Sequence, residues 1–365
     1  MRIGIDARMY EATGIGTYLK NLIANLSQID RTNQYFIFML SRDFDKVNLP
    51  QNFKKIKADY HWYSFGEQIF FPNLIKKTNV DIMHFPHFNA PVFYKGKFVV
   101  TIQDLILTLY PSSAGWFKRK IYNFALKRVV NKASFIITTS RNTKNDLIKY
   151  FSINLQKINV IPLASNLNRE NIDSSKQEEI IQKYGIKKDY LMYIGRLRKH
   201  KNILGIIESY KLAKEKYNIT NKLVFVGKID NSYIDLKEVL KEQGLEKDVL
   251  PIGYVSEDDL PQIYSAASML IFPSLYEGFG LPVLDAFSVG TPVITSNTSS
   301  LPEVAGDAAV LVDPKNIEEI ASGVQKILQD DNFRQSLIQK GYEQVKKFSW
   351  EKTAKDTLEV FNKIR

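Results

Sequence analysis

Short runs of β-branched and aromatic residues alternate along the chain with longer amphipathic segments. Such an alternation predicts strands and helices in turn, and therefore an α/β fold of parallel sheets covered by helices. The strand-like runs of the first half are 2–7, 35–40, 81–85, 98–104, 134–140 and 157–163. Those of the second half are 190–195, 222–227, 249–254, 269–274, 292–297 and 308–313.

A polar stretch without periodicity, from Ala164 to Gln177, interrupts this pattern. Because 365 residues exceed the size at which one core usually stops growing, the stretch predicts a linker between two domains. We predict an N-terminal domain over 1–165 and a C-terminal domain over 166–346, with a terminal amphipathic helix within 347–365. Ligands of such sheets bind beyond the carboxyl ends of the strands, so the following loops are where we expect chemistry.

Composition excludes several classes of protein. Hydrophobic residues make up 44% and charged residues 24%, which is typical of a folded globular chain. The absence of cysteine excludes disulfides, thiolate metal sites and cysteine nucleophiles. The first ten residues do not resemble a signal peptide, and no apolar run approaches the ~20 residues that span a bilayer. We therefore expect a cytoplasmic protein.

The net charge of +11 is unevenly distributed. Residues 1–150 contain 22 Lys and Arg against 10 Asp and Glu, whereas residues 151–365 contain 28 against 29. The first half thus carries all of the excess positive charge. Such one-sided charge indicates a surface that faces an anionic partner, either phospholipid or nucleic acid.

One predicted helix of the basic half has an apolar stripe bordered by lysines. The stripe consists of Phe117, Ile121 and Phe124, and the lysines are Lys120 and Lys127. This face either rests on anionic lipid at the inner face of a membrane or packs on the domain's own sheet.

The strongest motif is the loop after the run 269–274, where Glu277, Gly278 and Gly280 precede an apolar segment containing Asp285. Glycine lets the backbone approach a ligand closely, and free N–H groups at a helix start favour phosphate. If the helix reaches back to Glu277, both carboxylates face one ligand. No Lys or Arg occurs between residues 251 and 300, so the acids lack a local counter-charge. The alternative is a tight turn with a solvated acid.

A second motif is the basic loop within 193–203, "YIGRLRKHKNI", which follows a predicted strand. Arg196 offers a planar fork of donors and Lys201 a compact positive charge, a combination that neutralises a diphosphate. A merely solvated loop is the alternative.

Near the amino terminus, Gly14 and Gly16 join a strand to a helix. A dinucleotide-binding fingerprint needs a third glycine where Leu19 stands, so a dehydrogenase is disfavoured.

Histidines and polar residues end two other strands of the first half. His84 and His87 are separated by Pro86, which argues against a helical metal pair, and we favour His87 for a role in the cleft that two such sheets make when they face each other. Gln103 and Asp104 follow the next strand.

Asp43 and Asp45 form a D-x-D pattern, in which two nearby carboxylates can hold a divalent metal. We predict a polar turn there and no required metal or cofactor, because Arg196 and Lys201 already supply positive charge for phosphate.

The segment 273–297, continued to Pro314, resembles the retaining GT-B glycosyltransferases of family 4. The resemblance implies two Rossmann-like domains facing across a cleft, with the terminal helix crossing back to the first. It implies that Glu277 contacts the transferred sugar, that Asp285 binds ribose hydroxyls in place of the usual Glu, and that Gly280 and Leu281 offer N–H groups to the diphosphate. The remaining donor-binding residues expected in this domain are Tyr254, Gly278 and Phe279.

The same resemblance assigns the leaving group to Arg196 and Lys201, and it gives Gly14 and Gly16 a place beside donor phosphate and acceptor. Relatives often carry His where this chain has Gln103, which cannot transfer a proton. Gln103, Asp104 and His87 are thus the residues expected beside the sugar and acceptor.

The expected function is transfer of a hexose, with retention, from a nucleotide diphosphate sugar to a glycan or lipid-linked glycan. The chain is similar in character to bacterial mannosyl- and rhamnosyltransferases of polysaccharide assembly, which favours GDP-mannose over UDP- or dTDP-sugars. The alternatives are a non-catalytic sugar-nucleotide binder and a basic nucleic-acid-binding protein. We expect no nucleic-acid partner, because no recognition module is apparent.

Overall fold

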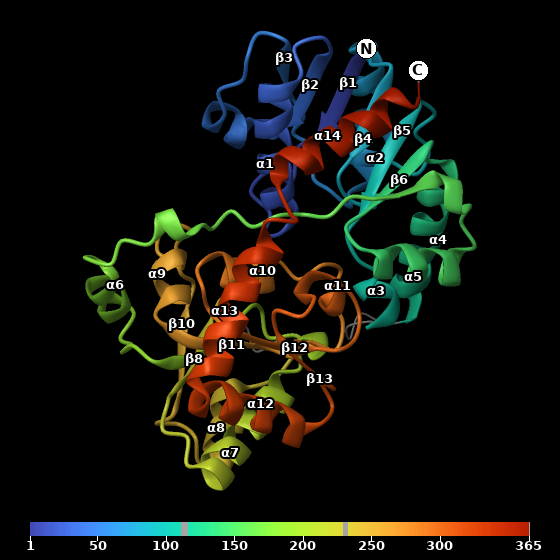
Figure 1. Ribbon diagram of the computed structural model, residues 1–365. Helices are drawn as coiled ribbons and strands as arrows, with labels where there is room; N and C mark the ends of the chain where they lie inside the picture. Colours follow the sequence, from blue (N-terminus) through green and yellow to red (C-terminus); the bar gives the residue numbers. More distant parts are fainter. Residues whose placement is uncertain (111–115, 229–232, 365) are drawn as a thin grey trace. The chain divides into compact units, whose positions relative to one another are not determined.

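The computed structural model describes residues 1–110, 116–228 and 233–364. They form two compact units (Figure 1). The N-terminal unit comprises Met1–Leu163 and Ser349–Arg365, and the C-terminal unit comprises Ala164–Phe348. The domain limits predicted from the sequence lie within a few residues of these bounds.

The N-terminal unit contains a seven-stranded sheet in the order β3-β2-β1-β4-β5-β6-β7, in which every neighbouring pair is parallel. Its strands are β1 (Arg2–Asp6), β2 (Gln34–Met39), β3 (Phe53–Lys57), β4 (Ile82–Phe85), β5 (Phe98–Ile102), β6 (Phe135–Thr138) and β7 (Ile158–Val160). Every residue of β4 and β5 is buried, which explains why both segments are continuous runs of mainly apolar residues.

Helices cover this sheet. They are α1 (Ile15–Ile29), α2 (Phe65–Lys77), α3 (Ile106–Leu109), α4 (Trp116–Lys132), α5 (Arg141–Phe151) and α14 (Trp350–Asn362), with the 3₁₀ turns η1 (Ser41–Lys46) and η2 (Leu155–Lys157). The terminal helix α14 packs against α1 (Figure 1). Its Thr353 Oγ1 donates to the carbonyl of Pro162 at 2.7 Å. The predicted return of the last helix to the first unit is confirmed.

The C-terminal unit contains a six-stranded sheet in the order β10-β9-β8-β11-β12-β13, again parallel throughout. Its strands are β8 (Tyr190–Ile194), β9 (Leu223–Val226), β10 (Val249–Gly253), β11 (Ala267–Phe272), β12 (Val293–Ser296) and β13 (Val310–Val312). Its helices are α6 (Gln177–Lys183), α7 (Ile203–Tyr217), α8 (Leu236–Gln243), α9 (Leu260–Ser265), α10 (Leu281–Ser288), α11 (Leu301–Ala305), α12 (Ile317–Gln329) and α13 (Asp331–Val345), with the turns η3 (Arg169–Asn171) and η4 (Lys199–Lys201).

Each strand-like run identified in the sequence overlaps an observed strand, and the α/β class of parallel sheets is confirmed. The strand β3 was not predicted. Its sequence FKKIK contains three lysines, and it lies at the edge of its sheet. Edge strands commonly carry lysine, which discourages pairing with other chains and hides the hydrophobic alternation of the strand.

Both sheets reverse their strand order once. The reversal lies between β1 and β4 in the N-terminal unit and between β8 and β11 in the C-terminal unit. At such a point the loops beyond the carboxyl ends diverge and leave room for a ligand. Each unit therefore has one such position.

Among the described residues, no helix has both the length and the apolar character needed to cross a bilayer.

Candidate active site

In the C-terminal unit, Lys201 and Glu277 meet at the reversal point of the sheet. The Lys201 Nζ lies 2.6 Å from Glu277 Oε1, and the two side chains are 17% and 9% exposed. Lys201 comes from the loop after β8 and Glu277 from the loop after β11, and these strands are neighbours. The Lys201 Nζ also lies 5.0 Å from the centre of the Phe272 ring.

The basic loop is held by backbone geometry at both of its ends. Gly195 has φ 144, and its carbonyl would lie 2.7 Å from a Cβ added to Gly227, so only glycine fits at position 227. At the other end Asn202 adopts the left-handed conformation. Its Nδ2 donates to the carbonyls of Pro273 at 3.1 Å and Pro314 at 2.6 Å. These bonds tie the lysine loop to the loops after β11 and β13.

The acid loop is fixed by two serines that sequence analysis missed. The backbone N–H of Glu277 donates to Ser299 Oγ at 3.0 Å, and that hydroxyl lies 2.7 Å from the Glu277 carbonyl. Ser300 Oγ donates to the carbonyl of Phe279 at 2.7 Å. The available signal was the polar sequence SNTSS at 296–300, which overlaps the end of the run 292–297 and continues beyond it at the same edge of the sheet.

One condition set for this loop is not met, and one expectation was wrong. The helix α10 begins at Leu281, with Gly280 as its N-cap, so the helix does not reach back to Glu277 and the two carboxylates do not lie on one helical face. Glu277 also has a counter-charge, because Lys201 is brought to it from 76 residues away. The absence of Lys and Arg near it in the sequence did not exclude an ion pair, since adjacent parallel strands place distant loops together.

Asp285 lies on α10 and accepts a hydrogen bond from Ser165 Oγ at 2.5 Å. Burial raises the pKa of Asp285 to about 7, and the Ser165 bond lowers it in part. Ser165 belongs to the stretch predicted as a linker, and nothing in the sequence pointed to its contact with Asp285.

The remaining predicted donor residues lie at the carboxyl edge of this sheet. Gly280 has φ 118, and a Cβ there would lie 2.8 Å from the Leu301 side chain, so this N-cap requires glycine. Leu281 is the first residue of α10, where backbone N–H groups have no partner within the helix. Phe279 is buried and Gly278 lies beside it, whereas Tyr254, directly after β10, is 73% exposed. Arg196 is exposed, and its carbonyl accepts from Tyr193 Oη at 3.0 Å.

In the N-terminal unit, three predicted residues line one pocket of about 230 Å³: His87, Gln103 and Asp104. Ile15, the first residue of α1 and the residue between Gly14 and Gly16, lines the same pocket. Burial lowers the pKa of His87 to about 4, so its imidazole is neutral at pH 7.

Gly14 and Gly16 have distinct structural roles at the start of α1. Gly14 is the N-cap of α1 with φ 77. A Cβ on Gly16 would lie 2.4 Å from the Tyr10 carbonyl, so the first turn of α1 packs tightly on the preceding loop.

Two other candidates are structural. His84 is fully buried, and its Nε2 lies 2.9 Å from Thr101 Oγ1. Asp43 lies in η1, is buried, and pairs with Lys46 at 3.0 Å, while Asp45 is exposed. Among the described residues, no group of three or more His, Cys, Asp or Glu side chains forms a metal-binding cluster.

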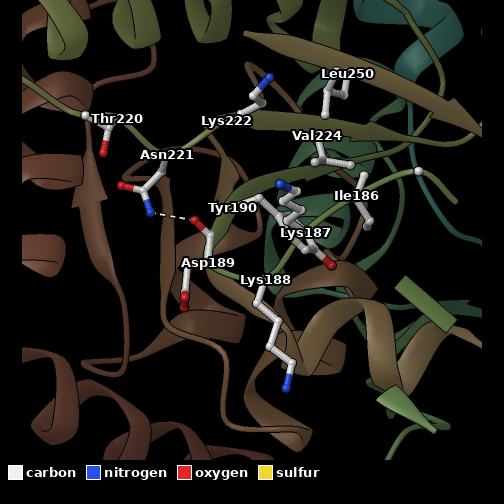
Figure 2. A pocket seen from close by; sticks show the side chains of 11 residues that line it. Ile186, Lys187, Lys188, Asp189, Tyr190, Thr220, Asn221, Lys222, Val224 and Leu250 are labelled. Atoms are coloured by element: carbon white, nitrogen blue, oxygen red, sulfur yellow. Dashed lines mark hydrogen bonds between the residues drawn. The ribbon is translucent and has the colours of Figure 1, made fainter. Parts of the chain in front are cut away.

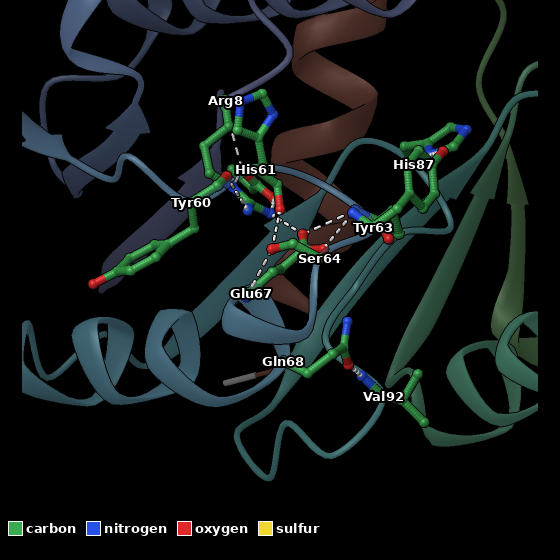
Figure 3. Close-up of polar contacts among 11 residues, drawn as sticks. Arg8, Tyr60, His61, Tyr63, Ser64, Glu67, Gln68, His87 and Val92 are labelled. Carbon is green, nitrogen blue, oxygen red and sulfur yellow. Dashed lines mark hydrogen bonds and ion pairs between the residues drawn. The ribbon is translucent and has the colours of Figure 1, made fainter.

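A buried charge cluster at the end of β1 was also missed, and Figure 3 shows two of its members, Arg8 and Glu67. Arg8 donates through Nε and Nη2 to both oxygens of Asp6, at 2.8 and 2.7 Å, and through Nη2 to Glu67 Oε1 at 2.6 Å. Arg8 is 2% exposed and Glu67 is fully buried. The signal for Glu67 was the sequence SFGE at 64–67, in which Ser64 caps α2 and accepts from the Glu67 N–H.

A further pocket of about 400 Å³, drawn in Figure 2, lies at the amino ends of β8 and β9. Lys187, Lys188 and Lys222 are among the residues that line it. Because the loops that carry Lys201 and Glu277 lie at the carboxyl ends of the strands, this pocket belongs to the opposite edge of the sheet.

Two family models match the chain. The one described as "Glycosyltransferase Family 4" matches residues 12–169, and the one described as "Glycosyl transferases group 1" matches residues 176–344. Among curated proteins, the O-antigen chain mannosyltransferase B of Escherichia coli is 28% identical over 372 residues, which is 96% of each chain.

Solved structures resemble the chain over its whole length. Sucrose-phosphate synthase from Thermosynechococcus elongatus has a TM-score of 0.77 at 20% identity, covering 100% of this chain and 98% of that one. Anabaena HepE, in complex with UDP and glucose, has a TM-score of 0.79 at 14% identity, covering 100% of both chains. At these identities the likeness shows the fold alone.

Proposed function

Because the chain belongs to the GT-B glycosyltransferases of family 4, we propose that it moves a hexose from a nucleotide diphosphate sugar to a glycan hydroxyl, with retention at the anomeric carbon. The observation that carries this proposal is the Lys201–Glu277 pair at the reversal point of the second sheet, 2.6 Å apart and partly exposed. GDP-mannose is the favoured donor, since a relative that matches 96% of the chain is named a mannosyltransferase.

The charges at this site suit departure of a diphosphate. An ammonium carries three donors, so Lys201 can hold Glu277 with one and phosphate with the others. Arg196 and the N–H groups at the start of α10 add positive potential where the leaving group develops negative charge. Glu277 would orient the sugar. The anomeric C–O bond to phosphate breaks, a C–O bond to the acceptor forms, and a donor phosphate oxygen takes the acceptor's proton.

This arrangement leads us to propose that no metal ion is required. Activity should then persist in EDTA, whereas loss of activity that added magnesium or manganese restores would contradict the proposal.

The test is transfer of radiolabelled sugar to a mannose-containing disaccharide on a hydrophobic aglycone, with GDP-mannose, UDP-glucose and dTDP-rhamnose compared as donors. Glu277→Ala should lower kcat by at least about 10²-fold while the circular dichroism spectrum is unchanged. Glu318→Ala is the matched control, because this carboxylate is 73% exposed and pairs with Lys216 at the surface. Equal activity of the two variants would remove Glu277 from the mechanism.

Stereochemistry provides a separate test. An α-linked donor should give an α-linked product, as read from the one-bond carbon–proton coupling at the anomeric carbon by NMR. A β-linked product would contradict retention.

For the acceptor, we propose a lipid-linked glycan reached at an anionic membrane surface through α4. Ile121 and Phe124 on this helix are 53% and 65% exposed, with Lys120 and Lys127 exposed beside them. Leu126 and Val130, on its other face, are buried. The alternative that the whole stripe packs on the sheet is wrong for these two residues, and the Phe117 side chain lies outside the described residues.

Co-sedimentation with vesicles tests this surface. Binding to vesicles containing phosphatidylglycerol should exceed binding to pure phosphatidylcholine, and the double change Ile121→Ser with Phe124→Ser should weaken it about tenfold or more. Leu311→Ser, at an exposed leucine of the C-terminal unit, is the control. Unchanged binding of the double variant, or tighter binding to duplex DNA than to either vesicle, would contradict a lipid surface.

A further inference from the structure

Tyr63 combines two properties that packing alone does not explain. Its backbone has φ 64, in the left-handed region that a residue with a bulky side chain rarely adopts. Its side chain is also 60% exposed, so this conformation is not maintained by burying the ring. Strained backbone held by its surroundings is concentrated at ligand sites.

The buried charge cluster holds Tyr63 in this conformation. The Tyr63 N–H donates to Glu67 Oε2 at 2.7 Å (Figure 3). The other oxygen of Glu67 accepts from Arg8 Nη2 at 2.6 Å and from Asn89 Nδ2 at 2.8 Å. Because Arg8 is in turn bound to Asp6 at the end of β1, the Tyr63 backbone is anchored to the centre of the sheet.

The side chain of Tyr63 is directed toward the pocket that contains His87. Its hydroxyl lies 3.4 Å from His87 Nδ1, and its ring centre lies 5.9 Å from that of Phe88. His87 and Phe88 line the pocket together with Gln103 and Asp104. An exposed aromatic ring therefore borders a small cavity whose other walls offer an amide and a carboxylate.

We propose that Tyr63 is the stacking platform for the sugar ring of the acceptor, with Gln103 and Asp104 binding the hydroxyls of that ring. This inference rests on the proposed glycosyl transfer. A pyranose presents an apolar C–H face that packs on an aromatic ring and a rim of hydroxyls that needs hydrogen-bonding groups, and this corner of the unit supplies both. A lipid chain would gain nothing from the fixed backbone or from the polar walls.

Steady-state kinetics of two variants test the platform. Tyr63→Ala should raise the acceptor KM about tenfold, whereas Tyr63→Phe, which keeps the ring, should change it less than about threefold. Hydrolysis of the donor without acceptor should keep its kcat and KM in both. Phe65→Ala is the matched control, because this neighbouring aromatic is 84% exposed and should leave both KM values unchanged.

Tyr63→Gly separates loss of the ring from loss of fold. Glycine adopts φ 64 without strain, so this variant should be at least as stable to heat as Tyr63→Ala and should show the same raised acceptor KM. Glu67→Gln should also raise the acceptor KM and leave donor hydrolysis unchanged, because it loosens the segment that presents the ring.

Two results would overturn the platform: an unchanged acceptor KM in Tyr63→Ala and Tyr63→Gly, or slower donor hydrolysis in either. If the unchanged protein neither hydrolyses nor transfers any nucleotide sugar, the proposed function itself fails. That result is distinct from an active enzyme in which Tyr63 makes no difference.

Discussion

The two units repeat one topology, but they use charge differently at the reversal points of their sheets. In the N-terminal unit, Asp6, Arg8 and Glu67 form a closed cluster in which Arg8 is 2% exposed and its fork of donors is occupied. In the C-terminal unit, Lys201 and Glu277 form a single ion pair whose side chains remain 17% and 9% exposed.

This difference indicates that the charge cluster of the N-terminal unit anchors the backbone, whereas the ion pair of the C-terminal unit can bind a ligand. The Arg8 guanidinium also lies 3.9 Å from the Phe71 ring centre, so solvent and ligands are kept from it. Burial raises the pKa of Glu67, and the charge of Arg8 opposes that rise, so the cluster depends on its arginine. The Lys201 ammonium instead retains donors that can meet phosphate. The same strand arrangement thus provides a rigid support in one unit and, under the proposed function, a ligand site in the other.

The largest expected effect is on stability in the N-terminal unit. Arg8→Ala leaves Asp6 and Glu67 buried without their counter-charge, which should lower the free energy of unfolding by about 3–5 kcal/mol, as measured by urea denaturation. Arg42→Ala is the control, since the Arg42 side chain is 64% exposed and 3.7 Å from Asp43. Arg42→Ala should lower the free energy of unfolding by less than about 1 kcal/mol. Similar losses of unfolding free energy in the two variants would show that the Arg8 cluster stabilises the fold no more than a surface ion pair does.

The next effect is on catalysis in the C-terminal unit. Lys201→Ala should lower kcat for the favoured donor by about 10²–10³-fold with little change in melting temperature, because in the proposed mechanism the Lys201 charge acts on the leaving group. Lys216→Ala, at an exposed ion pair, is the control. If Lys201→Ala unfolds the protein with near-normal activity per folded molecule, the pair is an anchor like the one at Arg8.

Sequence periodicity was sufficient to predict the two parallel sheets, because buried strands appear in the sequence as short apolar runs. Periodicity was insufficient to predict β3, because the lysines of this strand mask its alternation of hydrophobic and polar residues. The motifs located Glu277 and Lys201, but their pairing depends on β8 and β11 being neighbours, which no local pattern records. The contacts of Arg8 with Glu67 and of Ser165 with Asp285 were missed for the same reason, since the two partners lie 59 and 120 residues apart in the sequence.

A third, smaller effect is a pH dependence of donor binding. The pKa of Asp285 is about 7, raised by burial, so this carboxyl becomes protonated as pH falls through neutrality. If it accepts hydrogen bonds from ribose hydroxyls, donor affinity should fall by up to about tenfold per pH unit below 7, as measured by calorimetry. A pH-independent affinity would exclude Asp285 from the donor site.

Asp285→Asn is the check on this assignment. The pKa of Asp285 in the folded protein lies above the ordinary value of 3.8, so the folded state binds the carboxyl proton more tightly than the unfolded state. Protonated Asp285 therefore stabilises the fold at low pH, and this stabilisation is lost as pH rises from about 4 to 7. Asp285→Asn should remove that slope from the melting temperature as well as the pH dependence of donor binding.

The smallest effect is expected at His87, and its size completes the contrast between the units. Histidine ordinarily titrates near neutrality, but burial lowers the pKa of His87 to about 4, so the ring stays neutral across the range in which Asp285 changes charge. The acceptor KM, measured at saturating donor, should therefore vary less than about twofold between about pH 5.5 and 8. An acceptor KM that rises near pH 6.5 and becomes flat in His87→Asn would mean that this imidazole is open to solvent. The pocket that contains His87, Gln103 and Asp104 would then admit more solvent than the burial of His87 indicates.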